Sequence, residues 1–489
     1  MSRALSCDVL IIGLGPVGAT LAALLGDAGV DVLAIDKSTD VYPLPRAAHF
    51  DHEIMRVFQQ LGIAEAVLQH AQPATGYEFR SASGEVLLSL DTRPDAFAPS
   101  GWASGYMFNQ PGLERALRAK LAGQSTLRTL LNATYQGLET KAGGVEATIV
   151  DDQGSLKVQA RYLVGCDGAW SPVREEIGAK LDDLQFDEPW LVIDAIPRPG
   201  AKMPEVNLQI CDPARPTTCV LMGPGRHRWE FMLLPGETAE AVLDEAFIQG
   251  LLAPWEVDVE IERKAVYRFH GLVADRWRAG PVLIAGDAAH QTPPFAGQGM
   301  CAGIRDAANL AWKLAAVLAG RADDALLDTY QTEREPNARA YIALAINMGR
   351  VVCALDPEIA KMRDAQMLAA RAAGIPPMPP AAPPPITGAA VLAGTPAAGE
   401  LFPQPVVRQA DGAVLRLDDV LGAESWLITT ASLDEPRLAP FRDTLAAWLE
   451  ARGVAAVLVR PDRHVFGSGS AEHLANAWSA ALKAAPVAA

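Results

Sequence analysis

The first forty residues show a short apolar run, a glycine-rich turn, a helical stretch and a second apolar run. Residues 8–12 (DVLII) predict a buried strand, residues 16–29 a helix rich in Ala and Leu, and residues 30–36 a second strand. Two later apolar runs, at 161–168 and 280–290, each end in a Gly/Asp turn. The order is that of an α/β fold that opens with a βαβ unit.

Between these parts the pattern changes to alternation with many β-branched residues. This alternation occurs in residues 76–106 and 186–272 and predicts an antiparallel sheet inserted into the first domain. The sheet could form one side of a pocket. The first domain, predicted to be Rossmann-like, would then consist of 1–75, 107–185 and 273–374.

A proline run marks a further boundary. Residues 375–386 (IPPMPPAAPPPI) favour a semi-rigid polyproline linker. Beyond it, residues 387–489 predict a separate small α/β unit, with strands near SWLITT and AAVLVRP and helices near 439–452 and 471–484.

The glycine loop of the first domain has the spacing of a dinucleotide site. Gly13, Gly15 and Gly18 lie where the first strand gives way to the helix, and Asp36 ends the next strand. Glycines permit a tight turn and close approach to pyrophosphate, the helix N-terminus supplies N–H groups, and an acid can accept ribose hydroxyls. NAD and FAD both fit this pattern. The same predicted site includes Pro16, Val17 and Lys37.

Two further segments distinguish between these cofactors. GCDGAWSPVR (165–174) and AGDAAHQTPPFAGQGM (285–300) follow the glycine loop in order. Together the three segments resemble the signature of flavoprotein aromatic hydroxylases of the p-hydroxybenzoate hydroxylase type. The resemblance implies bound FAD, reduction by NADH or NADPH, and reaction with O2.

The resemblance also implies roles for individual residues. Asp287, after Gly286, would bind the ribityl or ribose side of FAD, and Asp167 with Gly168 would serve FAD and the reductant. Two flavin-lining positions match Arg46 and Gln110.

A loop that enters a helix completes the predicted flavin site. It contains Gly297, Gly299, Met300 and Cys301, and its N–H groups can stabilise negative charge on a reduced flavin ring. An asparagine is common in the family where Cys301 stands, so only the backbone role transfers.

Longer segments outside the signature narrow the resemblance. FDHEIMRVFQQLGI (50–63), RHRWEFML (226–233) and VLVRPDRHVFG (457–467) look like the 3-(3-hydroxyphenyl)propionate hydroxylase branch. This branch implies hydroxylation of a phenolic ring ortho to its hydroxyl through a flavin C4a-hydroperoxide. It also implies a C-terminal unit similar to thioredoxin, here without a redox dithiol because no cysteine follows Cys353. That unit is expected to be structural or an oligomer contact.

Such chemistry calls for a base or hydrogen-bond acceptor near the phenol, because phenolate is far more electron-rich than phenol. Asp194 closes an apolar strand and is one candidate; His49, Asp51 and His52 are others. Pro294 matches a family proline whose carbonyl faces the substrate, with a rigid turn as the alternative. For His290 a structural hydrogen bond is favoured.

A carboxylate tail on the substrate would suit an arginine fork. Arg215 is the residue that we assign to this role, although Arg226, Arg228 and Arg268 also qualify and the sequence does not choose among them.

Composition limits the possible partners. A net charge of −16 disfavours nucleic acid and anionic membranes. Six scattered cysteines without a CxxC, no N-terminal leader and no long apolar run favour a cytoplasmic protein. No metal is expected, because His49 and His52 lack a third ligand at the usual spacing. A homodimer is modestly favoured.

Other functions stay open. A hydroxylase of larger polyketide-type phenols would use the same machinery, and a non-catalytic flavin-binding redox or ligand sensor would share the cofactor site. A hydrolase is disfavoured because no GxSxG occurs.

Overall fold

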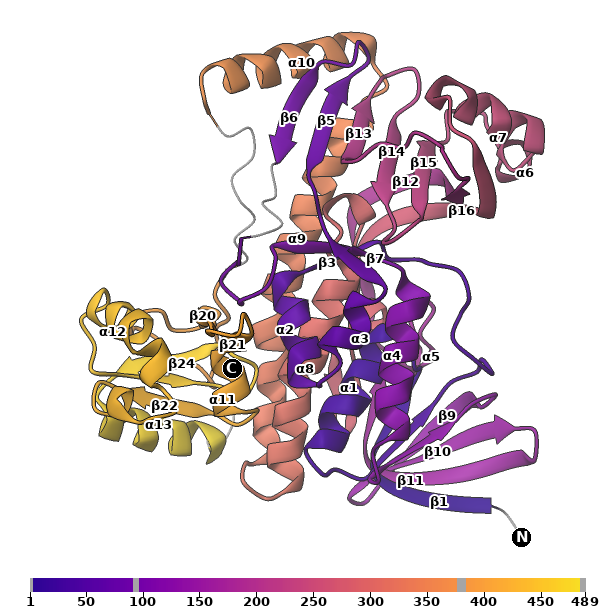
Figure 1. Cartoon of the computed structure of the whole chain (residues 1–489). Helices are drawn as coiled ribbons and strands as arrows, with labels where there is room; N and C mark the ends of the chain where they lie inside the picture. Colours follow the sequence, from indigo (N-terminus) through magenta and orange to yellow (C-terminus); the bar gives the residue numbers. More distant parts are fainter. Residues whose placement is uncertain (1–2, 91–95, 376–383, 484–489) are drawn as a thin grey trace.

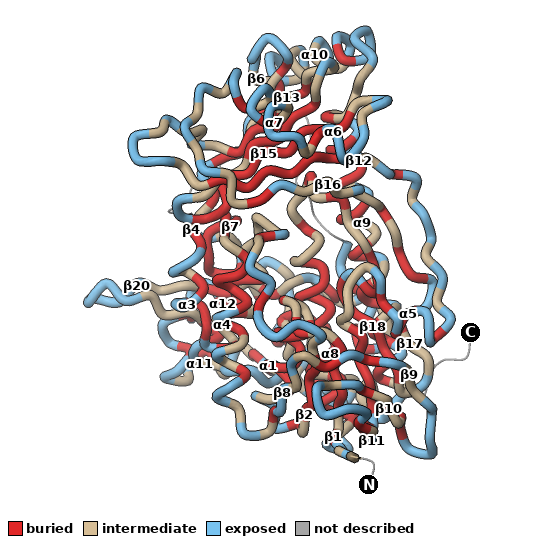
Figure 2. Tube along the Cα trace, turned by 90° about the vertical axis from the view of Figure 1, so that its right-hand side faces the viewer, coloured by how far each residue is buried: buried red, intermediate tan, exposed pale blue. Residues whose placement is uncertain are grey.

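The computed structural model describes residues 3–90, 96–375 and 384–483. Two eight-stranded sheets dominate it, one below the other in Figure 1, and Figure 2 shows buried backbone running through the central strands of both.

The lower sheet carries the predicted βαβ unit. Its order is β17-β18-β11-β1-β2-β8, with β9 and β10 attached to β11, and β1, β2, β8, β11 and β18 are mutually parallel. Residues 9–12 of β1 are almost completely buried, as expected for a strand covered on both faces. The strands are β1 (Arg3–Ile12), β2 (Val32–Ile35), β8 (Leu127–Leu130), β9 (Thr134–Lys141), β10 (Gly144–Asp151), β11 (Gly154–Gly165), β17 (Arg278–Ala279) and β18 (Val282–Ile284).

Two helices of this domain, α1 and α8, lie at the predicted places. Pro16 opens α1 at a position where its missing N–H costs nothing, and α1 packs against α4 and α8. The helices of this domain are α1 (Pro16–Asp27), α2 (His52–Gln60), α3 (Ala64–Leu68), α4 (Gln110–Ala122), α5 (Pro172–Glu176), α8 (Gly299–Leu318) and α9 (Thr329–Val352).

The upper sheet unites strands from both inserted segments. Its order is β19-β16-β12-β15-β14-β13-β5-β6, and β5 joins through a parallel pairing with β13. The strands are β5 (Tyr77–Ser81), β6 (Val86–Leu90), β12 (Leu181–Pro197), β13 (Asn207–Cys211), β14 (Thr217–Leu221), β15 (His227–Met232), β16 (Val259–Ala274) and β19 (His290–Gln291).

The two faces of this sheet differ. Trp229 and Phe231 of β15 join an apolar cluster with α6 (Ala239–Val242) and α7 (Glu245–Leu252) on the outer face. Because side chains alternate along a strand, Arg228 and Glu230 lie on the opposite face. That face meets the loops of the lower domain, next to a small sheet of β3 (His49–Asp51), β4 (Ala71–Pro73) and β7 (Gly105–Phe108).

Figure 1 shows α9 running from the lower domain towards the upper sheet, and α10 (Pro357–Ala372) lying over β6. No single helix in the described ranges has the length and apolar composition of a membrane span. The bent pair Asp324–Val352 and Pro357–Ala372 meets these criteria by length and composition alone.

The C-terminal unit has its own apolar core around Phe402, Trp426 and Phe441. A three-stranded antiparallel sheet, β22-β23-β24, stands with helices at the predicted positions. Its likeness to thioredoxin stays a prediction, and residues 376–383 of the predicted linker lie outside the described residues. The elements are β20 (Val406–Arg408), β21 (Val414–Arg416), α11 (Leu417–Leu421), β22 (Trp426–Thr429), α12 (Arg442–Glu450), β23 (Ala456–Val459), β24 (Val465–Gly469) and α13 (Ala471–Lys483).

Buried charges attach this unit to the lower domain. The Glu333 carboxylate of α9 accepts hydrogen bonds from Lys313 of α8 at 2.8 Å and from Arg460 at 2.7 Å, and all three side chains are fully buried. Asn309 donates to Glu333 and to Asp462. The two cations hold the pKa of Glu333 at about 2.

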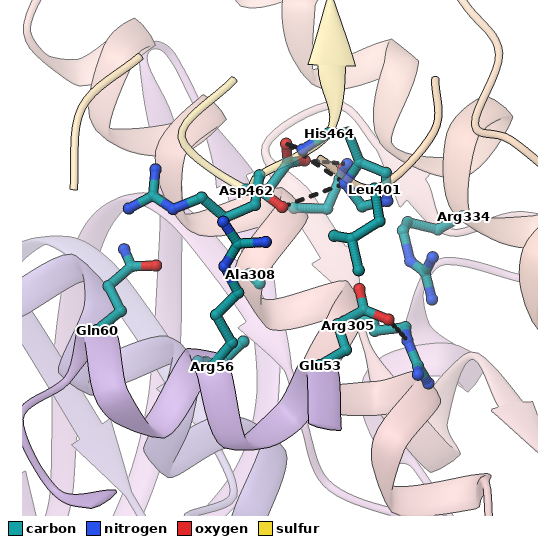
Figure 3. A pocket seen from close by; sticks show the side chains of 12 residues that line it. Glu53, Arg56, Gln60, Arg305, Ala308, Arg334, Leu401, Asp462 and His464 are labelled. Atoms are coloured by element: carbon teal, nitrogen blue, oxygen red, sulfur yellow. Dashed lines mark hydrogen bonds and ion pairs between the residues drawn. The ribbon is translucent and has the colours of Figure 1, made fainter. Parts of the chain in front are cut away.

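Beside this network lies a small cavity between α2, α8 and the C-terminal unit. In Figure 3, Glu53 and Arg56 of α2 face Asp462 and His464 across it. Its volume of about 20 Å³ is room for one water molecule.

We expect Glu333→Gln to lower the free energy of unfolding by roughly 3–5 kcal/mol, because it leaves Lys313 buried without its counter-charge and removes one of the two acids that pair with Arg460. The pKa of Glu333 is depressed from its ordinary 4.5 to about 2, so the stability that it contributes is present above pH 4.5 and is lost as the pH falls towards 2. Urea unfolding at pH 7 and pH 3 measures both effects.

The control for this variant is Glu424→Gln. Glu424 forms an exposed pair with Arg321 at 3.6 Å, so its loss should change stability by less than about 0.5 kcal/mol. Equal stability losses in the two variants would show that the buried network does not stabilise the attachment of the C-terminal unit to the lower domain.

Candidate active site

The glycine loop is as tight as its sequence predicts. Gly13 has a φ of +97°, and a Cβ there would collide with the carbonyl oxygen of Cys166. A Cβ on Gly18 would collide with the carbonyl oxygen of Gly13. A Cβ on Gly15, by contrast, would meet no atom within 4 Å. The loop is therefore closed at its base and open at the place where a pyrophosphate would approach.

Asp36 braces the same loop. Its two carboxylate oxygens accept hydrogen bonds from the backbone N–H groups of Leu14 and Ser38, each at 2.8 Å, and Arg118 lies 3.9 Å away. Each oxygen keeps a lone pair that could accept a ribose hydroxyl. Lys37 follows and is exposed.

The second motif supplies an acid with an unused oxygen. Gly168 has a φ of +83°, and Asp167 accepts a hydrogen bond from the N–H of Val173 at 3.1 Å through Oδ2. Oδ1 of Asp167 is buried and has no hydrogen-bond partner within the described part of the chain. Burial raises the pKa of this carboxyl. A buried acceptor of this kind is costly unless a ligand donates to it.

In the third motif Asp287 is exposed between the buried residues Gly286 and Ala288. The motif is held from α8 by Asp306. This carboxylate accepts hydrogen bonds from the N–H of Gly286 at 3.1 Å and, at 2.7 Å, faces Nε2 of His290. His290 therefore has a structural hydrogen bond.

The loop before α8 carries the other predicted flavin contacts. The carbonyl of Pro294 accepts a hydrogen bond from the N–H of Gly297 at 2.8 Å, which closes a 3-10 turn. Nδ1 of His49 lies 3.3 Å from the carbonyl oxygen of Gly297, and burial lowers the pKa of this histidine.

At the start of α8 no side chain caps the helix, so its first N–H groups are available to an anion. The side chain of Cys301 is buried within the protein, which leaves only its backbone for a cofactor. The N-terminal residues of the helix are Gly299, Met300 and Cys301.

Gln110 holds the segment that contains Arg46. Its Oε1 accepts hydrogen bonds from the N–H groups of Arg46, at 3.1 Å, and Ala47, at 2.6 Å, while its Nε2 donates to Glu114. The side chain of Arg46 is 53% exposed and lies 3.8 Å from Glu114. Gln110 thus positions the backbone and leaves the guanidinium available.

Asp194 lies in a different environment from the one expected of a base. It is 1% exposed, and its carboxylate pairs with Arg228 at 2.6 Å and with Arg263 at 3.4 Å. Arg228 also donates to the carbonyl oxygens of Pro45, at 2.9 Å, and Arg46, at 2.6 Å. The acid is committed to a buried ion pair and is not open to a phenol.

The arginines considered for a carboxylate tail are paired as well. Arg215 forms two hydrogen bonds with Glu237, at 2.6 and 2.7 Å. Arg226 pairs with Glu262 and Arg268 with Asp187. The assignment of Arg215 to a substrate carboxylate therefore lacks the free guanidinium that it requires.

Two other candidate bases, Asp51 and His52, lie at the start of α2. Asp51 caps α2 by accepting hydrogen bonds from the N–H groups of Glu53 and Ile54, and it also pairs with Arg305. His52 begins the helix, and its Nδ1 is buried without a partner among the described residues.

A chain of polar side chains that no sequence motif indicated crosses the inner face of the upper sheet. Thr218 donates to Oε1 of Gln209 at 2.7 Å, and Nε2 of Gln209 donates to the hydroxyl of Tyr77. That hydroxyl in turn donates to the carbonyl oxygen of Phe295 at 3.3 Å. Glu230 stands directly opposite Thr218 in the ladder.

Aromatic rings stand beside this chain. Phe295 packs against Trp190, with ring centroids 5.6 Å apart, and against Phe269, at 6.0 Å. Phe186 lies 5.8 Å from the same ring. The region where the sheet meets the third motif thus combines flat apolar surface with a few polar groups, as small-molecule sites do. No group of metal-ligating side chains occurs among the residues described.

Comparison with known proteins identifies this arrangement. The model of a family described as "FAD binding domain" matches residues 6–345. The chain belongs to this family. A probable NADH-specific resorcinol 4-hydroxylase of Rhodococcus jostii (strain RHA1) is 38% identical, over 94% of this chain and 91% of that protein. A 3-(3-hydroxy-phenyl)propionate/3-hydroxycinnamic acid hydroxylase of Mycobacterium sp. (strain JLS) is 37% identical, over 93% of this chain and 80% of that protein.

A solved structure agrees with the family. Aklavinone-11 hydroxylase with FAD and aklavinone is 25% identical and matches with a TM-score of 0.80, over 97% of this chain and 99% of that one. The expected cofactor class is thereby confirmed: the chain is an FAD-dependent monooxygenase of the aromatic-hydroxylase type, with a nicotinamide as its reductant.

We expect Gly15→Ala to leave the fold intact and weaken FAD binding, because the new methyl group enters space that is empty in the protein alone. Gly18→Ala should instead destabilise the protein, since its methyl group meets the backbone of Gly13. Flavin titration followed by fluorescence quenching, together with thermal unfolding of the flavin-free protein, separates the two effects. Unchanged FAD affinity in Gly15→Ala would place the pyrophosphate elsewhere.

Asp194→Asn should destabilise the hydroxylase by roughly 3–5 kcal/mol, because Arg228 and Arg263 would lose their buried counter-charge. Asp187→Asn, which removes an exposed partner of Arg268, is the matched control with little expected effect. Urea unfolding measures both. A stable Asp194→Asn protein that is slow only in hydroxylation would restore the role of Asp194 as a base.

Proposed function

We propose that this hydroxylase adds one oxygen atom to a small phenolic ring, ortho to its hydroxyl, with O2 and NADH or NADPH as co-substrates. The observation that carries this proposal is the inner face of the upper sheet. There the chain from Thr218 to Tyr77 and the rings around Phe295 stand directly over the third motif.

The residues present fit FAD. The open position at Gly15 accommodates a pyrophosphate, Oδ1 of Asp167 lacks a donor, and the uncapped start of α8 offers N–H groups to the anionic side of a flavin ring. Asp36 and Asp287 are proposed to hold the ribose and ribityl hydroxyls. When bound, reduced FAD supplies the electrons that activate O2 towards an electron-rich ring.

The protein's own task is to orient the phenol and exclude water. Phe269, which is partly exposed and stacks on the buried Trp190 beside Phe295, is the ring that we propose for contact with the substrate. The carbonyl of Pro294 is engaged in its turn, so we assign recognition of the phenolic oxygen to the polar chain rather than to this carbonyl.

Two substrate classes follow from the relatives, resorcinol and 3-(3-hydroxyphenyl)propionate. The four arginines suited to a carboxylate tail are all paired with acids, which favours a phenol without a carboxylate. A larger polyketide-type phenol is the alternative that the structural neighbour raises.

With purified holoenzyme we expect NADH oxidation to rise at least tenfold on addition of resorcinol, with a hydroxylated product in equal amount. The response to 3-(3-hydroxyphenyl)propionate should be weaker, because its carboxylate would have to displace an existing ion pair. Initial rates with both nicotinamides and product analysis by mass spectrometry measure this.

The other outcomes discriminate among the alternatives. A stronger response to the propionate would reverse the substrate order, and a response only to polycyclic phenols would support the polyketide class. Flavin reduction that no phenol accelerates, without hydroxylated product, would overturn the proposal in favour of a sensor.

A further inference from the structure

Glu230 is an acid without an obvious structural task. It lies in the middle of β15, on the face turned towards the cofactor domain, and it is 6% exposed. Its neighbours across the ladders are Val192 and Thr218. No described donor forms a hydrogen bond with its carboxylate, whereas nearly all buried carboxylates in proteins have one.

The nearest cation does not satisfy this acid. Arg228 is 3.7 Å from Oε1 of Glu230, but its guanidinium already binds Asp194 and the carbonyl oxygens of Pro45 and Arg46. Four of its five N–H groups are engaged in this way, and Nη1, which carries the fifth, stays beyond hydrogen-bond distance of Glu230. The carboxylate thus keeps lone pairs that face into the site.

The charged and titratable groups that act on Glu230 come from three strands. Burial raises its pKa to about 7, Arg228 of the same strand opposes this rise, and Asp194 of β12 adds to it. Tyr77 of β5 is the third group, and burial raises the pKa of its hydroxyl well above 10, so Tyr77 stays neutral at physiological pH. Glu230 is the group among these that changes charge near neutrality.

The surroundings suit a phenol. Tyr77 is anchored to the carbonyl oxygen of Phe295, beside the aromatic rings, and Trp190 shares the Glu230 face of the sheet. The indole N–H of Trp190 is buried without a partner in the described ranges. An unused acceptor and an unused donor on one face, next to flat apolar surface, match the needs of a hydroxylated ring.

We propose that Glu230 accepts the proton of the substrate's phenolic hydroxyl, an inference that rests on the proposed function and names the acceptor that it requires. The phenolic O–H bond breaks, its electron pair stays on the ring oxygen, and a new O–H bond forms on the carboxylate. The ring becomes phenolate and Glu230 a neutral acid. The proton returns to the product oxygen or to solvent after hydroxylation.

The raised basicity of the acid assists this transfer. A free phenol has a pKa of about 10 and an ordinary glutamate one of about 4.3, so a value of about 7 closes nearly half of that gap. A general base is most effective when its pKa lies near the working pH. Because the carboxylate is the active form, turnover should rise with pH through about 7.

The test uses holoenzyme and resorcinol as the probe. In the wild type we expect kcat to rise through an apparent pKa near 7, and the ultraviolet difference spectrum of bound resorcinol to show phenolate below its free pKa. Glu230→Gln should bind FAD normally and lose about 10²-fold in kcat. Its kcat should no longer rise with pH near 7, and bound resorcinol should form phenolate only at higher pH. Glu230→Asp should keep the rise of kcat near pH 7, with a lower kcat.

The control is Glu245→Gln, which changes a glutamate on α7 whose side chain is 64% exposed, away from this face. It should match the wild type in both pH profiles. If Glu230→Gln does not retain FAD, the Glu230→Asp protein and the spectral titration of the wild type still test whether Glu230 accepts the phenolic proton.

The outcomes distinguish failure of the Glu230 proposal from failure of the proposed function. If the wild type hydroxylates resorcinol and the Glu230 variants keep its pH profile and phenolate spectrum, Glu230 is not the acceptor, while the proposed function stands. If the wild type hydroxylates no phenol, the proposed function fails with it. A spectrum that shifts only in the Glu230 variants supports the inference even where another step limits turnover.

Discussion

Arg228, paired with Asp194 of the same sheet, joins the upper sheet to the cofactor domain. Arg228 donates to the carbonyl oxygens of Pro45 and Arg46, and Gln110 accepts from the N–H groups of Arg46 and Ala47. The sheet therefore holds the segment 45–47 through its backbone carbonyls, and α4 holds it through its backbone N–H groups. Two buried charges would be expensive alone, and these hydrogen bonds offset that cost. The separation between sheet and flavin loops is fixed by this contact.

The same ion pair explains why an acid on this face has an unusual pKa. Because Asp194 and two backbone carbonyls hold the guanidinium of Arg228, its Nη1 stays 3.7 Å from Glu230, beyond hydrogen-bond distance. Burial then outweighs attraction, and the pKa of Glu230 rises to about 7. A contact that holds the domains together thus also sets the protonation behaviour of the site, and the outer apolar face of the sheet shields it from solvent.

The sequence is sufficient to predict features that depend on local spacing. The βαβ unit, the glycine loop and the two later motifs are patterns within a few tens of residues, and the structure has the strands and helices where those patterns place them. The ion pairs could not be predicted, because Arg215, Arg226 and Arg268 meet acids 22, 36 and 81 positions away. The sheet and the loops at its strand ends bring those residues together only in the folded chain. The contact of Tyr77 with Gln209, 132 positions away, could not be predicted either, because it depends on the parallel pairing of β5 with β13.

The C-terminal unit acts on the site through α8. That helix begins at Gly299 beside the flavin loop, with N–H groups that no side chain caps. Fourteen positions further along the same helix, Lys313 joins the buried network with Glu333 of α9 and Arg460 of the C-terminal unit. An α-helix is stiff over this length, since each residue adds about 1.5 Å of hydrogen-bonded rise. The buried contacts of its later turns therefore also restrict the orientation of its first turn, beside the flavin loop.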